Sequence, residues 1–149
     1  MPGMSRRAVR AIVIKDDKLL VMHRNKFGHQ YYILIGGGVK GSETLEQALV
    51  REVYEETGLQ ATHARHVLTE EAGDPYGTQY IFLCAVADGT ITLHPDSQEA
   101  HINALGNNLH TPMWLPLSDL PKATFRSENL KAALINGIKN GFPEQPKTV

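Results

Sequence analysis

Three glutamates, Glu52, Glu55 and Glu56, lie within five consecutive positions of the segment REVYEETG, which spans residues 51–58. Such a run on a helix is commonly a solvated surface. Like charges one turn apart repel each other, however, and carboxylates in the last turn of a helix face the negative end of its dipole. Both effects are unfavourable, so the spacing raises the possibility of a cation bound between these side chains.

The helix that must carry these acids is predicted over residues 45–57. Thr44 and Gln47 have the spacing of a capping box, in which a hydroxyl begins the helix and an amide reaches back to it. Gly58 suits the left-handed residue that follows a helix. The acids therefore occupy the C-terminal half of a short amphipathic helix.

The apolar stripe of this helix continues into the acidic residues. At about 100° per residue, the stripe runs through Leu45, Ala48, Leu49, Glu52, Val53 and Glu56. Glu55 lies beside it. Unpaired charge on a face that meets the core is unfavourable, so the pattern favours a cation over a solvated surface.

The chemistry of the side chains indicates which cation this is. Oxygen ligands without nearby Cys or His favour Mg²⁺ or Mn²⁺ over zinc. Mg²⁺ takes one or two protein carboxylates and completes its shell with water and substrate phosphate oxygens. The upstream segment GGGVKG brings backbone close to a ligand, although a glycine cluster alone is more often only a tight turn. We therefore expect a phosphate-bearing substrate.

Composition limits the classes of protein that the chain can belong to. The 149 residues are 42% hydrophobic and 21% charged, which is typical of one globular domain. A net charge of −1 gives no electrostatic footprint for general nucleic-acid binding. The single Cys84 cannot form an internal disulfide, and no signal peptide or membrane span is evident, so we expect a cytoplasmic protein.

Hydrophobic periodicity predicts a mixed β-sheet with helices packed on its faces. Asp16 and Asp17 indicate a hairpin turn, a strand is expected to end at the glycines 36–38, and a last helix begins after Ser127. A Pro-rich tail at about residues 142–149 is expected to be poorly ordered. The predicted strands cover residues 7–15, 18–24, 30–35, 66–72, 78–87, 90–94 and 111–117.

The stretch GGVKGSETLEQALVREVYEETGL, which begins at Gly37, resembles the signature of the Nudix hydrolase family. The resemblance implies the Nudix fold, an α/β/α sandwich with a central mixed β-sheet, as a single domain over residues 1–149. It also implies metal-dependent hydrolysis of a nucleoside diphosphate linked to another moiety. One departure is Ile35, where the family usually has proline. The matching positions are Gly37, Glu43, Arg51, Glu52, Val53, Glu55, Glu56, Gly58 and Leu59.

The resemblance also assigns roles to residues. One of the three glutamates would serve as general base, and Glu52 is our choice among them. Arg51 would pair with Glu43 and orient the glutamates. An acid from a later loop joins the metal site in some members, and Glu99 is the candidate here. The implied metal ligands are Glu52, Glu55, Glu56, the carbonyl of Gly36, and Glu99.

Substrate-binding residues are harder to assign from the sequence. Arg10, Arg24 and Lys40 could hold phosphate oxygens, although such residues are more often ordinary surface charges. Tyr76 could stack on a base. In the family, a proline downstream of the signature suggests ADP-ribose and a tyrosine suggests diadenosine polyphosphates. Here Pro75 and Tyr76 are adjacent, so these substrates and nucleoside triphosphates all stay open.

Two alternatives to a Nudix pyrophosphohydrolase follow from the same resemblance. A Nudix-fold sensor module would bind a nucleotide without cleaving it, and such modules often lose one of the glutamates that this chain retains. An isoprenoid diphosphate isomerase would need a catalytic cysteine, and Cys84 lies in a core strand. The expected partner is a nucleotide-derived small molecule rather than nucleic acid or membrane, and a homodimer is plausible by resemblance.

Overall fold

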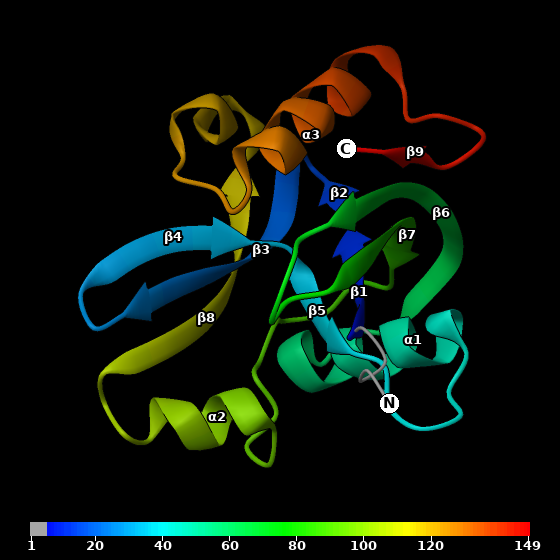
Figure 1. Ribbon diagram of the computed structural model, residues 1–149. Helices are drawn as coiled ribbons and strands as arrows, with labels where there is room; N and C mark the ends of the chain where they lie inside the picture. The colour runs from blue at the N-terminus through cyan, green and yellow to red at the C-terminus, as the bar shows by residue number, and fades with distance from the viewer. Residues whose placement is uncertain (1–5) are drawn as a thin grey trace.

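The structure is a computed structural model that describes residues 6–149. It contains two β-sheets and flanking helices, and the larger sheet mixes parallel and antiparallel strands (Figure 1). The predicted α/β class with a central mixed sheet is therefore confirmed.

In the larger sheet, β1 lies between β5 and β7. β1 pairs in parallel with β7 and antiparallel with β5, while β6 joins β7 antiparallel and β9 in parallel. In sheet order, the strands are β5 (Ile35–Gly38), β1 (Arg7–Ile12), β7 (Thr78–Val86), β6 (Ala61–Glu71) and β9 (Lys147–Thr148).

The smaller sheet is antiparallel and is built around β3. Its strands are β2 (Ile14–Lys15), β3 (Lys18–Lys26), β4 (His29–Ile33) and β8 (Asn108–Pro116). The predicted turn is present, and Asp16 and Asp17 both have positive φ, at 52° and 60°, as a tight hairpin requires. The strand predicted over residues 7–15 divides at Val13, so one continuous segment contributes to both sheets.

Two helices cover opposite faces of the larger sheet. α1 (Leu45–Thr57) packs on one face, and α3 (Glu128–Asn140) packs on the other (Figure 1). Side-chain alternation along the strands explains both cores: Val9 and Phe82 lie in the core that holds Leu49, whereas Ile12 and Ile81 lie in the core that holds Leu134. Two shorter helical segments complete the fold, α2 (Gln98–Asn103) and the 3₁₀ helix η1 (Leu117–Lys122).

The glycines of residues 36–38 belong to a strand, β5, although the sequence predicts that a strand ends at them. β5 runs through Gly38 and pairs Gly36 with Arg10 and Gly37 with Val9. Gly36 has φ of 153°, and a Cβ there would lie 1.9 Å from the carbonyl oxygen of Val9. Glycine is therefore required at this position because β5 lies so close to β1. The prediction treats these glycines as strand breakers and does not include this close approach.

Two other predicted segments differ in the structure. Residues 90–94 form no strand; instead the N–H of Thr92 donates to the carbonyl of Thr57, and that of His94 to the carbonyl of Glu55. These contacts satisfy carbonyls at the end of α1 that have no partner within the helix. The segment around Glu99, expected to be a loop, forms α2.

The C-terminal segment is ordered into the fold, where a poorly ordered tail was expected. Phe142 packs against Gly137 of α3, and β9 pairs with β6 through Leu68 and Thr69. Pro143 and Pro146 both precede β9, so the N–H groups of the strand itself stay free to pair. Among residues 6–149, no helix combines the length and apolar character needed to span a bilayer.

Candidate active site

α1 places the glutamates as the sequence predicts. Thr44 and Gln47 form the capping box, and Gly58 ends the helix in the left-handed conformation with φ of 74°. Glu52 and Glu56 are buried on the face that meets the sheet, with exposures of only 7% and 4%. The predicted continuation of the apolar stripe into acidic residues is confirmed for these two side chains.

Glu56 is a buried carboxylate with one backbone partner. Its Oε2 accepts a hydrogen bond of 2.9 Å from the N–H of Gly36. Burial raises the pKa of Glu56 well above its ordinary value, the negative charges of Glu52 and Glu99 raise it further, and Arg10 opposes them. The side chain therefore sits where a cation would stabilise its charged form.

Glu52 lies against the backbone of β5. A Cβ at Gly37 would lie 2.6 Å from the carboxyl group of Glu52, so only glycine leaves room for this side chain. Burial raises the pKa of Glu52, while a hydrogen bond from Arg51 acts in the opposite direction. Gly36 thus binds Glu56 and Gly37 leaves room for Glu52, so that both buried glutamates lie against the edge strand β5.

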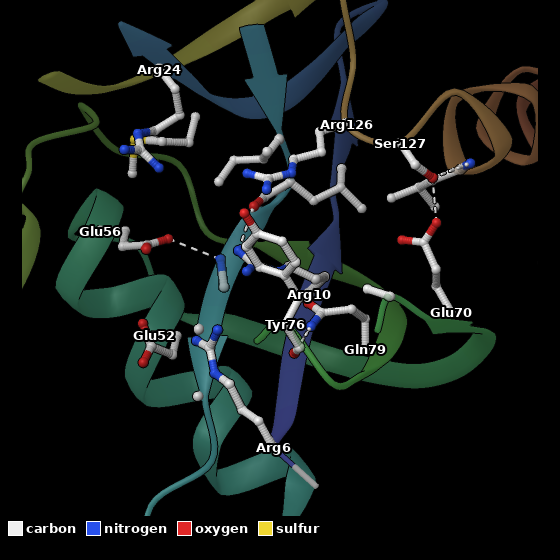
Figure 2. A pocket seen from close by; sticks show the side chains of 18 of the residues that line it. Arg6, Arg10, Arg24, Glu52, Glu56, Glu70, Tyr76, Gln79, Arg126 and Ser127 are labelled. Carbon is white, nitrogen blue, oxygen red and sulfur yellow. Dashed lines mark hydrogen bonds between the residues drawn. The ribbon is translucent and has the colours of Figure 1, made fainter. Parts of the chain in front are cut away.

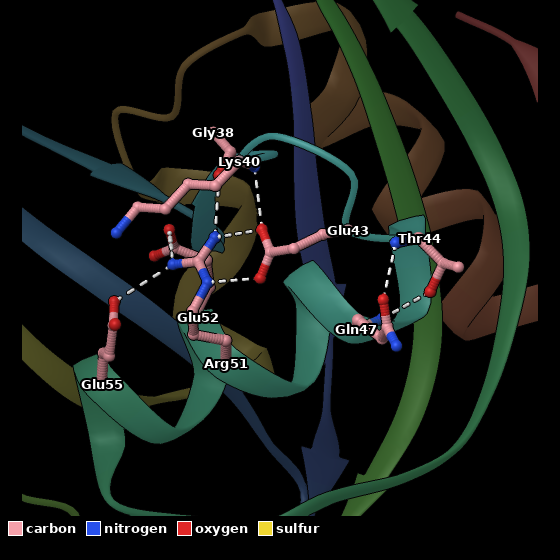
Figure 3. A network of polar contacts seen from close by, with 8 residues as sticks. All are labelled: Gly38, Lys40, Glu43, Thr44, Gln47, Arg51, Glu52 and Glu55. Atoms are coloured by element: carbon pink, nitrogen blue, oxygen red, sulfur yellow. Dashed lines mark hydrogen bonds and ion pairs between the residues drawn. The ribbon is translucent and has the colours of Figure 1, made fainter.

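Arg51, which also lies on α1, fixes the orientation of Glu43, Glu52 and Glu55 (Figure 3). Its guanidinium forms a bidentate pair with Glu43, with N–O distances of 2.7 and 2.9 Å. It also donates to Glu52 at 2.9 Å, to Glu55 at 3.3 Å and to the carbonyl of Gly38 at 3.0 Å. The hydrogen bond from Arg51 lowers the pKa of Glu43 to about 2. The pairing of Arg51 with Glu43 is as expected from the sequence.

A pocket of about 520 Å³ opens beside Glu52 and Glu56 (Figure 2). Its volume is in the range of small-molecule sites. We call Gly36, Gly37, Glu52 and Glu56 the glutamate wall. Across from it, the opposite wall consists of Arg10, Tyr76, Gln79, Arg126 and Glu70.

Arg10 is the most firmly held cation of the opposite wall. Its Nε donates to Gln79 Oε1 at 3.0 Å, and its Nη1 donates to the carbonyl of Leu34 at 3.1 Å. Gln79 in turn donates to the carbonyl of Tyr76 at 2.7 Å. Burial lowers the pKa of Arg10, and the charge of Glu56 opposes this effect. These bonds leave the remaining N–H groups of Arg10 available for an anion in the pocket.

The structure brings most of the candidate residues together in the pocket, but Arg51, Lys40 and Glu55 do not line it. Lys40 is exposed and lies outside the pocket, where its backbone N–H caps Glu43, and Glu55 is turned toward Arg51 rather than into the pocket. Gly36 contacts Glu56 through its N–H, so a role for its carbonyl stays a prediction. The candidates that do line the pocket are Arg10, Arg24, Gly36, Glu52, Glu56, Tyr76 and Glu99.

Sequence reasoning missed several residues of the opposite wall. Arg126 lies over the ring of Tyr76, with its guanidinium carbon 4.0 Å from the ring centroid. It immediately precedes the residue that caps α3, and that position is the only sequence signal that could have drawn attention to it. The pocket residues not anticipated include Arg6, Glu70, Gln79, His110, Arg126 and Ser127.

The donor set of the glutamate wall suits a hard divalent cation. Within residues 6–149, no three Asp, Glu, His or Cys side chains converge on one point. Two buried carboxylates face the pocket, with Glu99 near enough to influence the pKa of both. Two protein carboxylates are the number that Mg²⁺ commonly takes when water and phosphate oxygens supply the other ligands. The residues present therefore fit this ion.

Comparison with solved structures defines the class of fold. A NUDIX hydrolase from Nitrosomonas europaea superposes with a TM-score of 0.72 over 100% of this chain and 81% of its own, at 15% identity. An ADP-ribose pyrophosphatase from Streptococcus suis gives 0.68 over 98% and 100%, at 18% identity. The fold is that of Nudix hydrolases.

The sequence comparison goes one step further. A sequence model of the NUDIX domain matches residues 4–134, and the chain therefore belongs to the Nudix family. The ADP-ribose pyrophosphatase of Methanocaldococcus jannaschii is 32% identical over 128 residues, which is 83% of this chain and 69% of that protein. The NAD-capped RNA hydrolase NudC of Photobacterium profundum is 33% identical over 121 residues, 80% of this chain. The chain spans 41% of that protein and 34% of the Edwardsiella ictaluri NudC.

Proposed function

We propose that this protein is a metal-dependent pyrophosphohydrolase. Its substrate is a nucleoside diphosphate linked to another moiety, and water attacks one phosphorus of the diphosphate. The observation that carries the proposal is the burial of Glu52 and Glu56 in one pocket with Arg10 facing them. The names of the related ADP-ribose pyrophosphatase and NudC proteins support a nucleotide-derived substrate.

Glu52 and Glu56 would hold Mg²⁺ or Mn²⁺, with Glu99 adjacent. When bound, the ion would neutralise phosphate charge and lower the pKa of a coordinated water. We propose that Glu52 is the residue that accepts the proton of the attacking water. The hydrogen bond that it accepts from Arg51 holds its carboxylate in one orientation at the pocket.

Arg10 would bind the diphosphate from the side facing the glutamates. Its contacts with Gln79 and Leu34 fix the guanidinium before substrate arrives, so little side-chain entropy is lost on binding. Arg24 lines the same pocket and is held by Asn108. Opposed carboxylates and guanidiniums of this kind can bind a cation and a diphosphate together.

A panel of nucleoside diphosphate derivatives, assayed with Mg²⁺ and with Mn²⁺, tests the proposal. The panel includes ADP-ribose, a dinucleoside polyphosphate, nucleoside triphosphates and NAD-capped RNA, the last because of the NudC relatives. We expect turnover of at least one compound that is lost on chelation of the metal. Glu52→Gln should lower kcat by about 10²-fold or more, the usual contribution of a positioned base.

The matched control is Glu46→Gln, which removes the same charge from an exposed position in the first turn of α1. It should leave kcat within about twofold of the wild type, as expected for a surface substitution away from the site. Tight nucleotide binding without turnover of any compound would instead favour the sensor module. Turnover that survives both Glu52→Gln and Glu56→Gln would refute the assignment of the site.

A further inference from the structure

The chemical character of the pocket changes along its length. Glu52 and Glu56 lie at one side, Arg10 and Arg126 lie in the middle, and Glu70 lies at the other side (Figure 2). We call the last region the far end of the pocket; it consists of Glu70, Glu71, Ser127 and Asn129. A substrate that reaches from the glutamate wall past the arginines therefore meets acceptor oxygens rather than further cations.

Glu70 is held in place by the start of α3. The hydroxyl of Ser127 donates to its Oε2, and the same hydroxyl accepts a 3.2 Å hydrogen bond from the N–H of Leu130 as the cap of the helix. Glu70 Oε1 accepts no hydrogen bond from any residue of the described range 6–149. Glu70 also pairs across the sheet with Gln79, the residue that orients Arg10. The free oxygen is thus fixed relative to the proposed diphosphate site.

The start of α3 could itself attract a phosphate, since helix N-termini bind anions. Here that position is already compensated. Ser127 caps the helix, the carboxylate of Glu70 contacts the cap, and Glu128 occupies the first turn. An additional phosphate at the far end would lie against negative charge.

The middle of the pocket contains the arginines that could bind the phosphates of a substrate. Arg126 stacks on Tyr76 and lies 5.5 Å from the ring of Tyr31, so two aromatic rings keep its guanidinium near one position. Together with Arg10 it can serve two phosphate groups. Beyond Arg126, the carboxylates and the Asn129 amide offer acceptors that suit hydroxyl groups.

We propose that the far end binds a hydroxyl-bearing group, such as a sugar ring, joined to the diphosphate, and that Glu70 selects this group against a third phosphate. This inference rests on the proposed function and narrows its substrate to nucleoside diphosphate sugars. A carboxylate accepts a strong hydrogen bond from a hydroxyl, whereas it repels a phosphate oxygen that carries the same sign of charge.

The test compares kcat/KM for ADP-ribose and ATP, with Mg²⁺, in the wild type and in Glu70→Gln. The amide of Gln can still accept from Ser127, so the packing of α3 is kept while the charge is removed. We expect the wild type to prefer ADP-ribose. In Glu70→Gln this preference should fall by about tenfold, which corresponds to one hydrogen bond to a charged group. Glu71→Gln serves as a second variant with a smaller shift in the same direction.

Glu144→Gln is the matched control, because Glu144 is exposed and lies outside the pocket. It removes the same charge and should leave the ratio unchanged within twofold. A wild type that prefers ATP, or a Glu70→Gln variant that keeps the wild-type ratio, would overturn the inference.

Measurements of ligand binding can distinguish a failure of this inference from a failure of the proposed function. Dissociation constants for ADP-ribose and ATP are measured in Glu52→Gln, with and without the added Glu70→Gln change, so that turnover plays no part. If neither compound is cleaved by the wild type but the ratio of dissociation constants shifts as expected, the far end is assigned and hydrolysis of these two compounds is refuted. An unchanged ratio refutes the far-end assignment regardless of turnover.

Discussion

The glutamate wall and the opposite wall differ in how they are assembled. The first comes from β5 and α1, within one stretch of chain, and the Arg51 contacts that orient it span eight residues or fewer apart from the one to Gly38. The second joins residues far apart: Arg10 and Gln79 are separated by 69 positions, and Glu70 and Ser127 by 57. A local pattern can specify the first wall, whereas only the folded sheet and α3 create the second.

This difference also separates their chemistry. The glutamate wall keeps acids on a buried helix face at the expense of stability, since burial raises the pKa of both Glu52 and Glu56. The opposite wall is made of groups that contacts within the protein hold in place, such as Arg10 by Gln79, while other donors and acceptors of the same groups stay available to a ligand. Under the proposed function, the glutamate wall would serve the reaction and the opposite wall would recognise the substrate, and four substitutions test how the two walls differ.

The largest expected effect is that of Glu56→Gln. We expect activity to fall by about 10²-fold or more, while stability rises at neutral pH. Because the folded-state pKa of Glu56 is raised, the native protein binds more protons than the unfolded chain above the ordinary carboxyl range, and stability falls as pH increases. Urea unfolding at pH 5 and pH 8 should show a smaller fall for the variant. A variant that is destabilised at pH 8 would mean that Glu56 serves the fold.

Gly36→Ala tests the close approach on which the glutamate wall depends. A Cβ at this position would lie 1.9 Å from the carbonyl oxygen of Val9 and force β5 away from β1. We expect a loss of about 3 kcal/mol in the free energy of unfolding. Gly28→Ala is the control: it also has positive φ, at 88°, but meets no atom within 4 Å. Equal losses in the two variants would show that backbone conformation, rather than the approach to Val9, determines the effect.

His110 lies on β8 of the smaller sheet and lines the same pocket, so its titration tests how buried this side of the pocket is. Burial and the charge of Arg24 lower the pKa of His110 to about 4. The unfolded chain therefore binds more protons between pH 4 and 6.5, and stability rises with pH across this window. His110→Asn should reduce that rise by about 2 kcal/mol, measured as the difference between wild-type and variant unfolding free energies. An identical pH slope in both proteins would contradict the burial of a neutral imidazole.

Thr44→Ala should have the smallest effect and act on stability alone. The hydroxyl of Thr44 accepts from the N–H of Gln47 at 3.1 Å and begins α1 two turns before Glu52. Its removal should lower the free energy of unfolding by about 1 kcal/mol. The value of kcat should stay within twofold of the wild type. A large loss of kcat would show that the start of the helix also positions the glutamates.

Much of the glutamate wall could be predicted from the sequence because its determinants are local. The bounds of α1, its two caps and the burial of Glu52 and Glu56 follow from spacing within the helix. The division of residues 7–15 between two sheets could not be predicted, since the apolar residues on both sides of Val13 are equally suited to a strand. The glycine strand β5 was missed because its close neighbours, Val9 and Glu52, belong to other elements.

The opposite wall shows the limit of such reasoning. Arg10, Arg24 and Tyr76 were proposed by residue type and do line the pocket, yet Lys40, proposed on the same grounds, points elsewhere. Arg126 and Glu70 have no local feature that distinguishes them from surface charges. Their place in the pocket depends on where α3 docks against the sheet and on the pairing of β6 with β7.

The pairing of β9 with β6 has a practical consequence for work on this protein. Val149 donates its N–H to the carbonyl of Thr69, directly beside Glu70. Truncation before Lys147 would remove the partner strand of β6, and an affinity tag fused at the C-terminus could disturb its pairing. An unpaired strand edge favours self-association. A change of ligand preference in such a preparation would then be caused by the altered C-terminus rather than by the native enzyme.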